Sequence, residues 1–282
     1  TLGSEYLYQN NNAFLSEWVT QIKKSGLTSP IELYVADNYF GYQGTSRKWI
    51  REDMGNYYAA CSYGISVFDN TYRLYFNTMD TSKPPVILRT DPEQPDINFL
   101  NTITYNTTGK DNGYVWGEPF SFNRQLEGNI PAKKESFSIK GDIPDPGLYL
   151  GQSLTKILKQ QGIEVKKLNT AREDYYTKSD NLASAGKVFY THRSTALSNI
   201  IKVVNVRSNN HYTEHLIRTL GRKHNSDVYS ESLSEGITYI QDFWEGKGLS
   251  TDGLFMYDGS GLAPSNAVTP ELMCGILRYM YT

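Results

Sequence analysis

Apolar positions at the start of the chain recur with a helical period. In residues 12–24 they fall three and four positions apart, which is typical of an amphipathic helix that packs by one face. Gly26 follows at a position that suits the end of this helix. Residues 31–35 predict a β-strand, and the Asp37-Asn38 pair predicts a turn.

The stretch up to residue 146 has the pattern of β-structure. Short strand-like runs are separated by turn residues, and eight prolines interrupt the chain between residues 81 and 146. Helical periodicity is weak there, so the sequence predicts a β-rich accessory region. The predicted strands are residues 63–68, 72–76, 85–88, 99–105, 113–116 and 136–139.

After residue 146 the helical period returns. Apolar residues between positions 150 and 158 share one helix face, and Gly162 marks the end of that helix. Thr269 is the predicted N-cap of the last helix, because Pro270 fits a first helical turn. The remaining predicted helices are residues 196–204, 209–220 (ending at Gly221) and 232–244.

The order of these elements predicts an α+β fold in which accessory segments accompany a helical core. We expect a mixed α/β inserted domain over residues 1–80 and a β-rich accessory region over residues 81–146. Residues 147–282 form the helical part of the main domain in this division.

Composition narrows the class of protein. The 282 residues are 39% apolar and 21% charged, which indicates a folded chain, and the net charge of −2 argues against nucleic acid as a partner. No apolar run reaches the roughly 18 residues that a membrane-spanning helix needs. The two cysteines, Cys61 and Cys274, lie far apart, so thiolate zinc sites and dithiol redox motifs are excluded and a single disulfide stays open.

The strongest chemical signal is a Ser-x-Asn turn between two predicted helices, with Ser208 and Asn210 as its polar pair. In acyl transfer by a serine enzyme, such a hydroxyl relays a proton and such an amide holds a catalytic lysine or the substrate backbone. The local sequence alone also fits a simpler role, in which Ser208 caps the helix that follows.

Further segments place this turn in a family. The stretch 197–221 around Ser208, together with four other blocks in the same order, resembles the D-Ala-D-Ala carboxypeptidases among the low-molecular-mass (class C) penicillin-binding proteins. Residues 37–40 depart from the family pattern, because Asn38 precedes the tyrosine where the family has serine. The four blocks are Thr-Leu-Gly-Ser at 1–4, Asp-Asn-Tyr-Phe at 37–40, the tryptophan and aspartate at 49 and 53, and Asp-Gly-Ser-Gly-Leu at 258–262.

The resemblance implies part of a β-lactamase/transpeptidase-like domain with β-rich inserted domains. It implies a serine-type D-Ala-D-Ala carboxypeptidase or endopeptidase that acts on peptidoglycan stem peptides through an acyl-enzyme and binds β-lactams. Ser208 and Asn210 would be catalytic, whereas Asp258 and Ser260 are weaker candidates for the substrate pocket, since a tight glycine turn also explains their block. No cofactor is implied. An extracytoplasmic or periplasmic location follows, peripheral membrane association is compatible with it, and the oligomeric state stays open.

Two family motifs have no match at the expected places. The family has Ser-x-x-Lys before the segment that resembles residues 1–4 and Lys-Thr-Gly after the helix that begins at Thr269. We therefore expect residues 1–282 alone to be a fragment that is inactive. Ser153-x-x-Lys156 and the Lys-Ser-Gly at 24–26 match those motifs only by letters, because each lies in a segment of a different kind.

Two other functions remain open. His211, Glu214 and His215 match the H-x-x-E-H pattern of inverted zinc peptidases, although neither candidate third ligand, Glu231 or Glu235, belongs to a supporting motif. The second alternative is a non-catalytic wall-binding or scaffolding protein that retains the fold without the chemistry.

Overall fold

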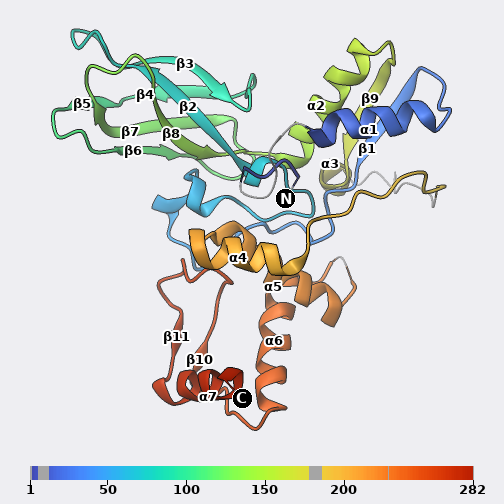
Figure 1. Ribbon diagram of the computed structural model, residues 1–282, viewed down its shortest axis with the longest axis vertical. Helices are drawn as coiled ribbons and strands as arrows, with labels where there is room; N and C mark the ends of the chain where they lie inside the picture. The colour runs from blue at the N-terminus through green and yellow to red at the C-terminus, as the bar shows by residue number, and fades with distance from the viewer. Residues whose placement is uncertain (1, 6–12, 178–185, 228, 282) are drawn as a thin grey trace.

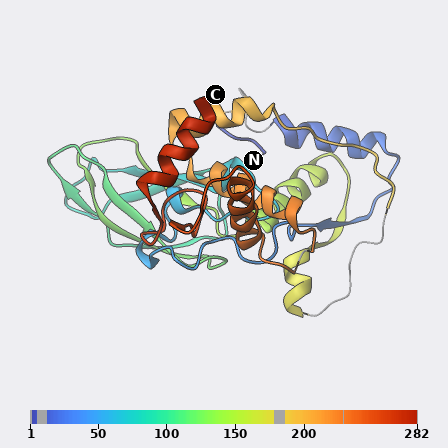
Figure 2. The same cartoon turned by 90° about the horizontal axis from the view of Figure 1, so that it is seen from below.

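The computed structural model describes residues 2–5, 13–177, 186–227 and 229–281. Its elements form three groups, which Figure 1 shows as a β-rich lobe, a small α/β unit beside it and a helical group below both. Within the helical group, α4 (Leu197–Arg207) and α5 (Asn210–His224) lie nearest to the two upper units, and Figure 2 shows the group from beneath.

Two sheets form the β-rich lobe. Antiparallel strand β2 lies between β3 and β8, while β7 pairs with β4 and β5 in parallel and with β6 antiparallel. Every second residue of β2 is buried, and Leu74 and Phe76 join Val115 and Leu126 in one core. The strands are β2 (Thr71–Asn77), β3 (Val86–Asp91), β4 (Asn98–Asn101), β5 (Thr104–Asn106), β6 (Asn112–Trp116), β7 (Asn123–Pro131) and β8 (Phe137–Asp142).

The small α/β unit joins segments that are far apart in sequence. Strand β1 (Ile31–Val35) pairs in parallel with β9 (Val165–Thr170), and helices α1 (Ala13–Lys24) and α2 (Pro146–Gln160) pack beside this pair. The predicted first helix and strand are confirmed, whereas β9 and the short helix α3 (Ala171–Thr177) were not predicted. The pairing of β1 with β9 crosses both expected domain boundaries, so the division at residues 80 and 146 stays a prediction.

The helical group contains α4 (Leu197–Arg207), α5 (Asn210–His224), α6 (Ser232–Glu245) and α7 (Pro270–Tyr281), with the short pair β10 (Leu254–Phe255) and β11 (Ala267–Val268). Thr269 caps α7 as expected, since its hydroxyl accepts a bond of 3.3 Å from the Leu272 amide. The predicted end of α5 at Gly221 is wrong. Gly221 lies inside the helix, where a Cβ would stand 1.9 Å from the Ser232 carbonyl oxygen of α6.

The predicted strand at residues 63–68 is also wrong. Its backbone bonds to loops instead of a neighbouring strand, because the Gly64 amide donates to the Asp37 carbonyl and the Phe68 amide donates to the Leu2 carbonyl. A 3₁₀ turn, Phe68–Asn70, follows directly and leads into β2. Cys61 is buried and Cys274 is exposed, and both thiols are free, so they form no disulfide. Among the described residues, no helix is long and apolar enough to cross a membrane.

Candidate active site

The turn between α4 and α5 holds Ser208 in an unusual backbone conformation. Ser208 ends α4 with φ 49° and ψ 52°, in the left-handed region, which costs a non-glycine residue roughly 1–2 kcal/mol. The N-cap of α5 is Asn209, whose side chain accepts a bond of 3.0 Å from the Tyr212 amide. The simpler role considered for Ser208, that of a helix N-cap, is therefore wrong, and its hydroxyl is not needed for capping.

Ser208 and Asn210 line one pocket. The Ser208 side chain is exposed, and its hydroxyl makes no hydrogen bond within the part of the chain that the structure describes. The Asn210 amide nitrogen donates to the Tyr58 carbonyl at 2.9 Å, which fixes the side chain and leaves its oxygen as an acceptor. The other lining residues come from the N-terminal segment, the stretch from residue 57 to the start of β2, β8 and the turn itself: Glu5, Tyr57, Tyr58, Asp69, Thr71, Lys140, Arg207, Asn209 and His211.

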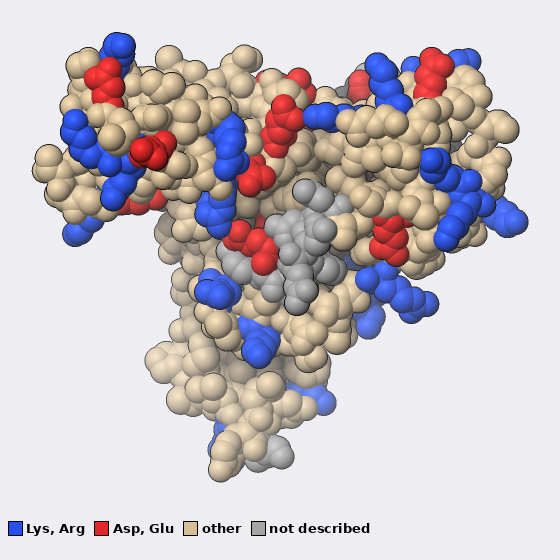
Figure 3. All heavy atoms as spheres, turned by 45° about the horizontal axis from the view of Figure 1, so that its top comes forward, with Lys and Arg blue, Asp and Glu red and all other residues tan. Residues whose placement is uncertain are grey.

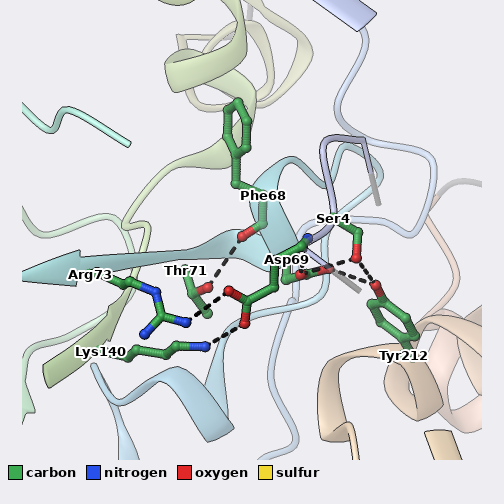
Figure 4. Close-up of polar contacts among 8 residues, drawn as sticks. Ser4, Phe68, Asp69, Thr71, Arg73, Lys140 and Tyr212 are labelled. Atoms are coloured by element: carbon green, nitrogen blue, oxygen red, sulfur yellow. Dashed lines mark hydrogen bonds and ion pairs between the residues drawn. The ribbon is translucent and has the colours of Figure 1, made fainter. Parts of the chain in front are cut away.

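Charged side chains form one wall of this pocket. The Glu5 carboxylate pairs with Arg73 at 2.9 Å and with Lys140 at 2.5 Å, and these two cations are register partners on β2 and β8 (Figure 4). Figure 3 shows positive and negative side chains interspersed over one face of the molecule without a field of single sign. The pocket wall is therefore polar and of mixed charge. The sequence alone did not identify Lys140 and Glu5, because both reach the turn through long-range contacts. Lys140 is placed by the pairing of β2 with β8, and Glu5 by its contacts with Asp69, Arg73 and Lys140.

The Asp258 carboxylate is buried and bonded within the fold. Its two carboxylate oxygens accept four hydrogen bonds of 2.6–2.9 Å, and the side chain is 1% exposed. One donor is the Trp49 indole at 2.9 Å, so two of the blocks that resemble the family are joined directly. The remaining donors are the amides of Gly261 and Ala263 and the side chain of Asn266.

Ser260 stands on the same turn, and its amide donates to Glu214 of α5 at 2.9 Å. Asp258 and Ser260 line an apolar groove with Trp244 and Met273, a surface that does not include Ser208 or Asn210. The structure thus does not bring the two weaker candidates into the pocket of the Ser-x-Asn turn.

Of the side chains of the alternative zinc site, Glu214 and His211 contact other groups. Glu214 accepts bonds from the amides of Gly259 and Ser260, at 2.7 and 2.9 Å. His211 Nε2 lies 2.7 Å from the Ser66 hydroxyl, and burial lowers the pKa of His215 to about 3. No group of three or more possible metal ligands occurs among the residues that the structure describes.

The two segments that match the Ser-x-x-Lys and Lys-Thr-Gly motifs only by letters also lie away from the turn. Ser153 and Lys156 are on α2, where the Lys156 ammonium pairs with Glu93 at 2.9 Å. Gly26 ends α1 with φ 77°, as the sequence predicted. Neither segment lines the pocket of Ser208.

The family is decided by a sequence profile of the D-Ala-D-Ala carboxypeptidase 3 (S13) family, which matches residues 6–282. The chain belongs to this family. It is similar to a D-alanyl-D-alanine carboxypeptidase of Actinomadura sp., with 23% identity over 273 residues, or 93% of this chain and 49% of that protein. It is also similar to the penicillin-sensitive carboxypeptidase A of Dictyostelium discoideum, with 22% identity over 240 residues, or 83% and 44%. This S13 chain therefore spans about half the length of the curated relatives it matches.

The S13 chain also has relatives of known structure. Penicillin binding protein 4 from Haemophilus influenzae superposes with a TM-score of 0.77 at 17% identity, over 96% of this chain and 58% of that one. The complex of that protein with a β-lactam superposes with a TM-score of 0.68 at 16% identity, over 96% and 56%. The predicted α+β fold of a penicillin-binding protein is confirmed by this match.

Proposed function

We propose that the protein is a serine-type D-Ala-D-Ala carboxypeptidase or endopeptidase, in which Ser208 and Asn210 form the middle part of an acyl-transfer site. The observation that carries the proposal is the exposed Ser208 hydroxyl, held beside the Asn210 side chain in one polar pocket. A strained backbone conformation that exposes a hydroxyl, as in this turn between two helices, is typical of a functional position.

Each side chain of the turn has a defined task in this chemistry. A serine from the family's Ser-x-x-Lys motif attacks the penultimate D-Ala carbonyl, and the proton it loses returns to the leaving amine. The Ser208 hydroxyl relays that proton, and the Asn210 amide oxygen accepts a hydrogen bond from the lysine or from the substrate N–H. Water then cleaves the acyl-enzyme and releases the shortened peptide.

The partners and the location follow from this reaction. Peptidoglycan stem peptides are the proposed substrates, and β-lactams are the proposed covalent inhibitors, because a β-lactam presents a reactive amide at the same point. The structural relative from Haemophilus influenzae forms a complex with a β-lactam, which supports this part of the proposal. We place the protein outside the cytoplasmic membrane, where its substrate lies.

Labelling with a fluorescent penicillin tests the proposal. The complete gene product that contains residues 1–282 is expected to form a covalent adduct and to release D-alanine from a D-Ala-D-Ala peptide. Residues 1–282 alone are expected to remain unlabelled, since Ser153 and Lys156 do not reach the turn. A complete protein that gains no adduct and releases no D-alanine would contradict the enzyme and favour the wall-binding alternative.

A further inference from the structure

The first turn of α5 is bonded to one stretch of chain by three consecutive side chains. Asn210 donates to the Tyr58 carbonyl at 2.9 Å, and His211 Nε2 lies 2.7 Å from the Ser66 hydroxyl. The third residue, Tyr212, donates its hydroxyl to the Asp69 carboxylate at 2.8 Å. The position of the Ser208–Asn210 turn is therefore set by the segment between residues 58 and 69.

Asp69 is the most heavily bonded point of that segment. One carboxylate oxygen accepts from Tyr212, and the other accepts from the Ser4 hydroxyl at 3.2 Å and from the Glu5 amide at 3.3 Å (Figure 4). Ser4 and Tyr212 also contact each other through their hydroxyls. Ser4 and Tyr212 are 0% and 3% exposed and do not line the pocket, so neither side chain is placed to touch a substrate. Asp69 lines the pocket but is only 4% exposed.

The backbone at Asp69 is strained in a way that needs support. Phe68, Asp69 and Asn70 have φ values of 52°, 57° and 50°, three left-handed residues in a row without a glycine. Such strain persists only where surrounding bonds hold it. Asn70 supplies two of them, because its side chain accepts from the Val67 amide at 2.9 Å and donates to the Cys61 carbonyl at 2.8 Å.

We infer that Asp69 is a positioning residue for the acyl-transfer site, acting on the Ser208–Asn210 turn through Tyr212 and Ser4. The strained turn at residues 68–70 leads directly into β2, whose Arg73 holds Glu5. The strained turn at residues 68–70 and the N-terminal segment thus support the first turn of α5 from one side. This inference rests on the proposed function, because it assigns these supporting contacts a role in that reaction.

Removal of the Tyr212 hydroxyl is the sharpest test. In the complete gene product, Tyr212→Phe keeps the ring and deletes the bond to Asp69. The second-order rate of acylation by benzylpenicillin is expected to fall about tenfold or more, since small misplacements of catalytic groups carry large rate costs. On a D-Ala-D-Ala peptide the loss is expected in kcat with KM nearly unchanged, because Tyr212 does not touch the substrate.

Two further variants separate positioning from general stability. Thr102→Val removes a comparable bond, from the Thr102 hydroxyl to the Leu126 carbonyl at 2.6 Å, in the β-rich lobe away from the turn. It is expected to lower the melting temperature without changing the acylation rate. Ser4→Ala is expected to slow acylation, and the Tyr212→Phe, Ser4→Ala double variant to lose less than the product of the two single effects.

The outcomes distinguish this inference from the function on which it rests. If the wild-type protein acylates and Tyr212→Phe acylates as fast as Thr102→Val, Asp69 is structural only and the inference is overturned. A loss that appears wholly in KM overturns it as well, since Tyr212 would then act on substrate binding. If the wild-type protein does not acylate at all, the proposed function fails and this inference fails with it.

Discussion

At the scale of single residues, sequence and structure agree best where a side chain has a local role. Gly26 ends a helix and Thr269 caps one, and both roles follow from neighbours within four residues. Ser208 was correctly identified as a polar residue of a turn, but its left-handed backbone depends on how α4 meets α5, which no local pattern encodes. The roles of Asp69 and Lys140 depend on contacts 143 and 135 positions away, with Tyr212 and Glu5.

Two histidines of α5, His211 and His215, predict how stability depends on pH. Burial lowers the pKa of His215 to about 3 and that of His211 well below its usual range. Nδ1 of His215 donates to the His211 carbonyl at 2.8 Å, and its Nε2 is buried without a partner among the described residues, so the neutral ring is the folded form. Unfolding therefore takes up protons, and stability is complete above about pH 6.5 and declines as the pH falls.

We expect His215→Asn to flatten that decline by about 1.4 kcal/mol per pH unit between pH 6 and pH 4. The Asn amide nitrogen can replace Nδ1 as donor to the carbonyl but carries no titrating group. Urea unfolding at several pH values measures the slope. Thr219→Ala, at an exposed position of the same helix and without a titrating side chain, serves as the control and should leave the slope unchanged. An equal slope in wild type and His215→Asn would show that the ring titrates normally.

At the scale of elements, periodicity located the longer helices and the β-rich stretch but misread other features. The run at 63–68 has strand-forming residues and yet bonds to loops, because strand formation needs a partner strand at the right distance. Strand β9 was missed because VKKLNT is mostly polar and lacks a hydrophobic alternation, and its place comes from parallel pairing with β1. In both cases tertiary partners decide the outcome and local preference does not.

Gly221 was read as the end of a helix, whereas it marks a close contact between two helices. Gly221 of α5 and Gly236 of α6 face each other so closely that a Cβ on Gly236 would stand 2.1 Å from the Ile217 carbonyl oxygen. A glycine in a helical pattern thus has two meanings, a stop or a contact. Only the position of the partner helix distinguishes them.

The close contact of α5 with α6 at Gly221 predicts that one added methyl group lowers the stability of the protein. Gly221→Ala should lower the free energy of unfolding by about 1–3 kcal/mol, because the added Cβ forces α5 and α6 apart. Thr219→Ala, on the exposed face of the same helix, should change it by less than about 0.5 kcal/mol. Chemical denaturation of both variants measures the difference. Equal stabilities would mean that the two helices pack less closely than described.

At the scale of the whole molecule, the blocks that resemble the family are scattered in sequence but joined in space. Residues 2–4 meet α5 through Ser4 and Tyr212, and Trp49 donates to Asp258 across 209 positions. The sequence predicted the family and the α+β class because these blocks keep their order. It could not predict the composition of the pocket, which three separate parts of the chain assemble around the Ser208–Asn210 turn.

The most direct test of the account is the acylation rate of Ser208→Ala in the complete gene product. The hydroxyl makes no hydrogen bond within the described part of the chain, so its removal should leave the fold intact and act on the chemistry alone. With benzylpenicillin, the account predicts a second-order acylation rate lowered by about 100-fold or more, the usual scale for loss of a proton-transfer group. Ser234→Ala, an exposed serine of α6, is the matched control and should react like wild type. Acylation of Ser208→Ala within threefold of the wild-type rate would contradict the claim that this turn faces the reacting bond.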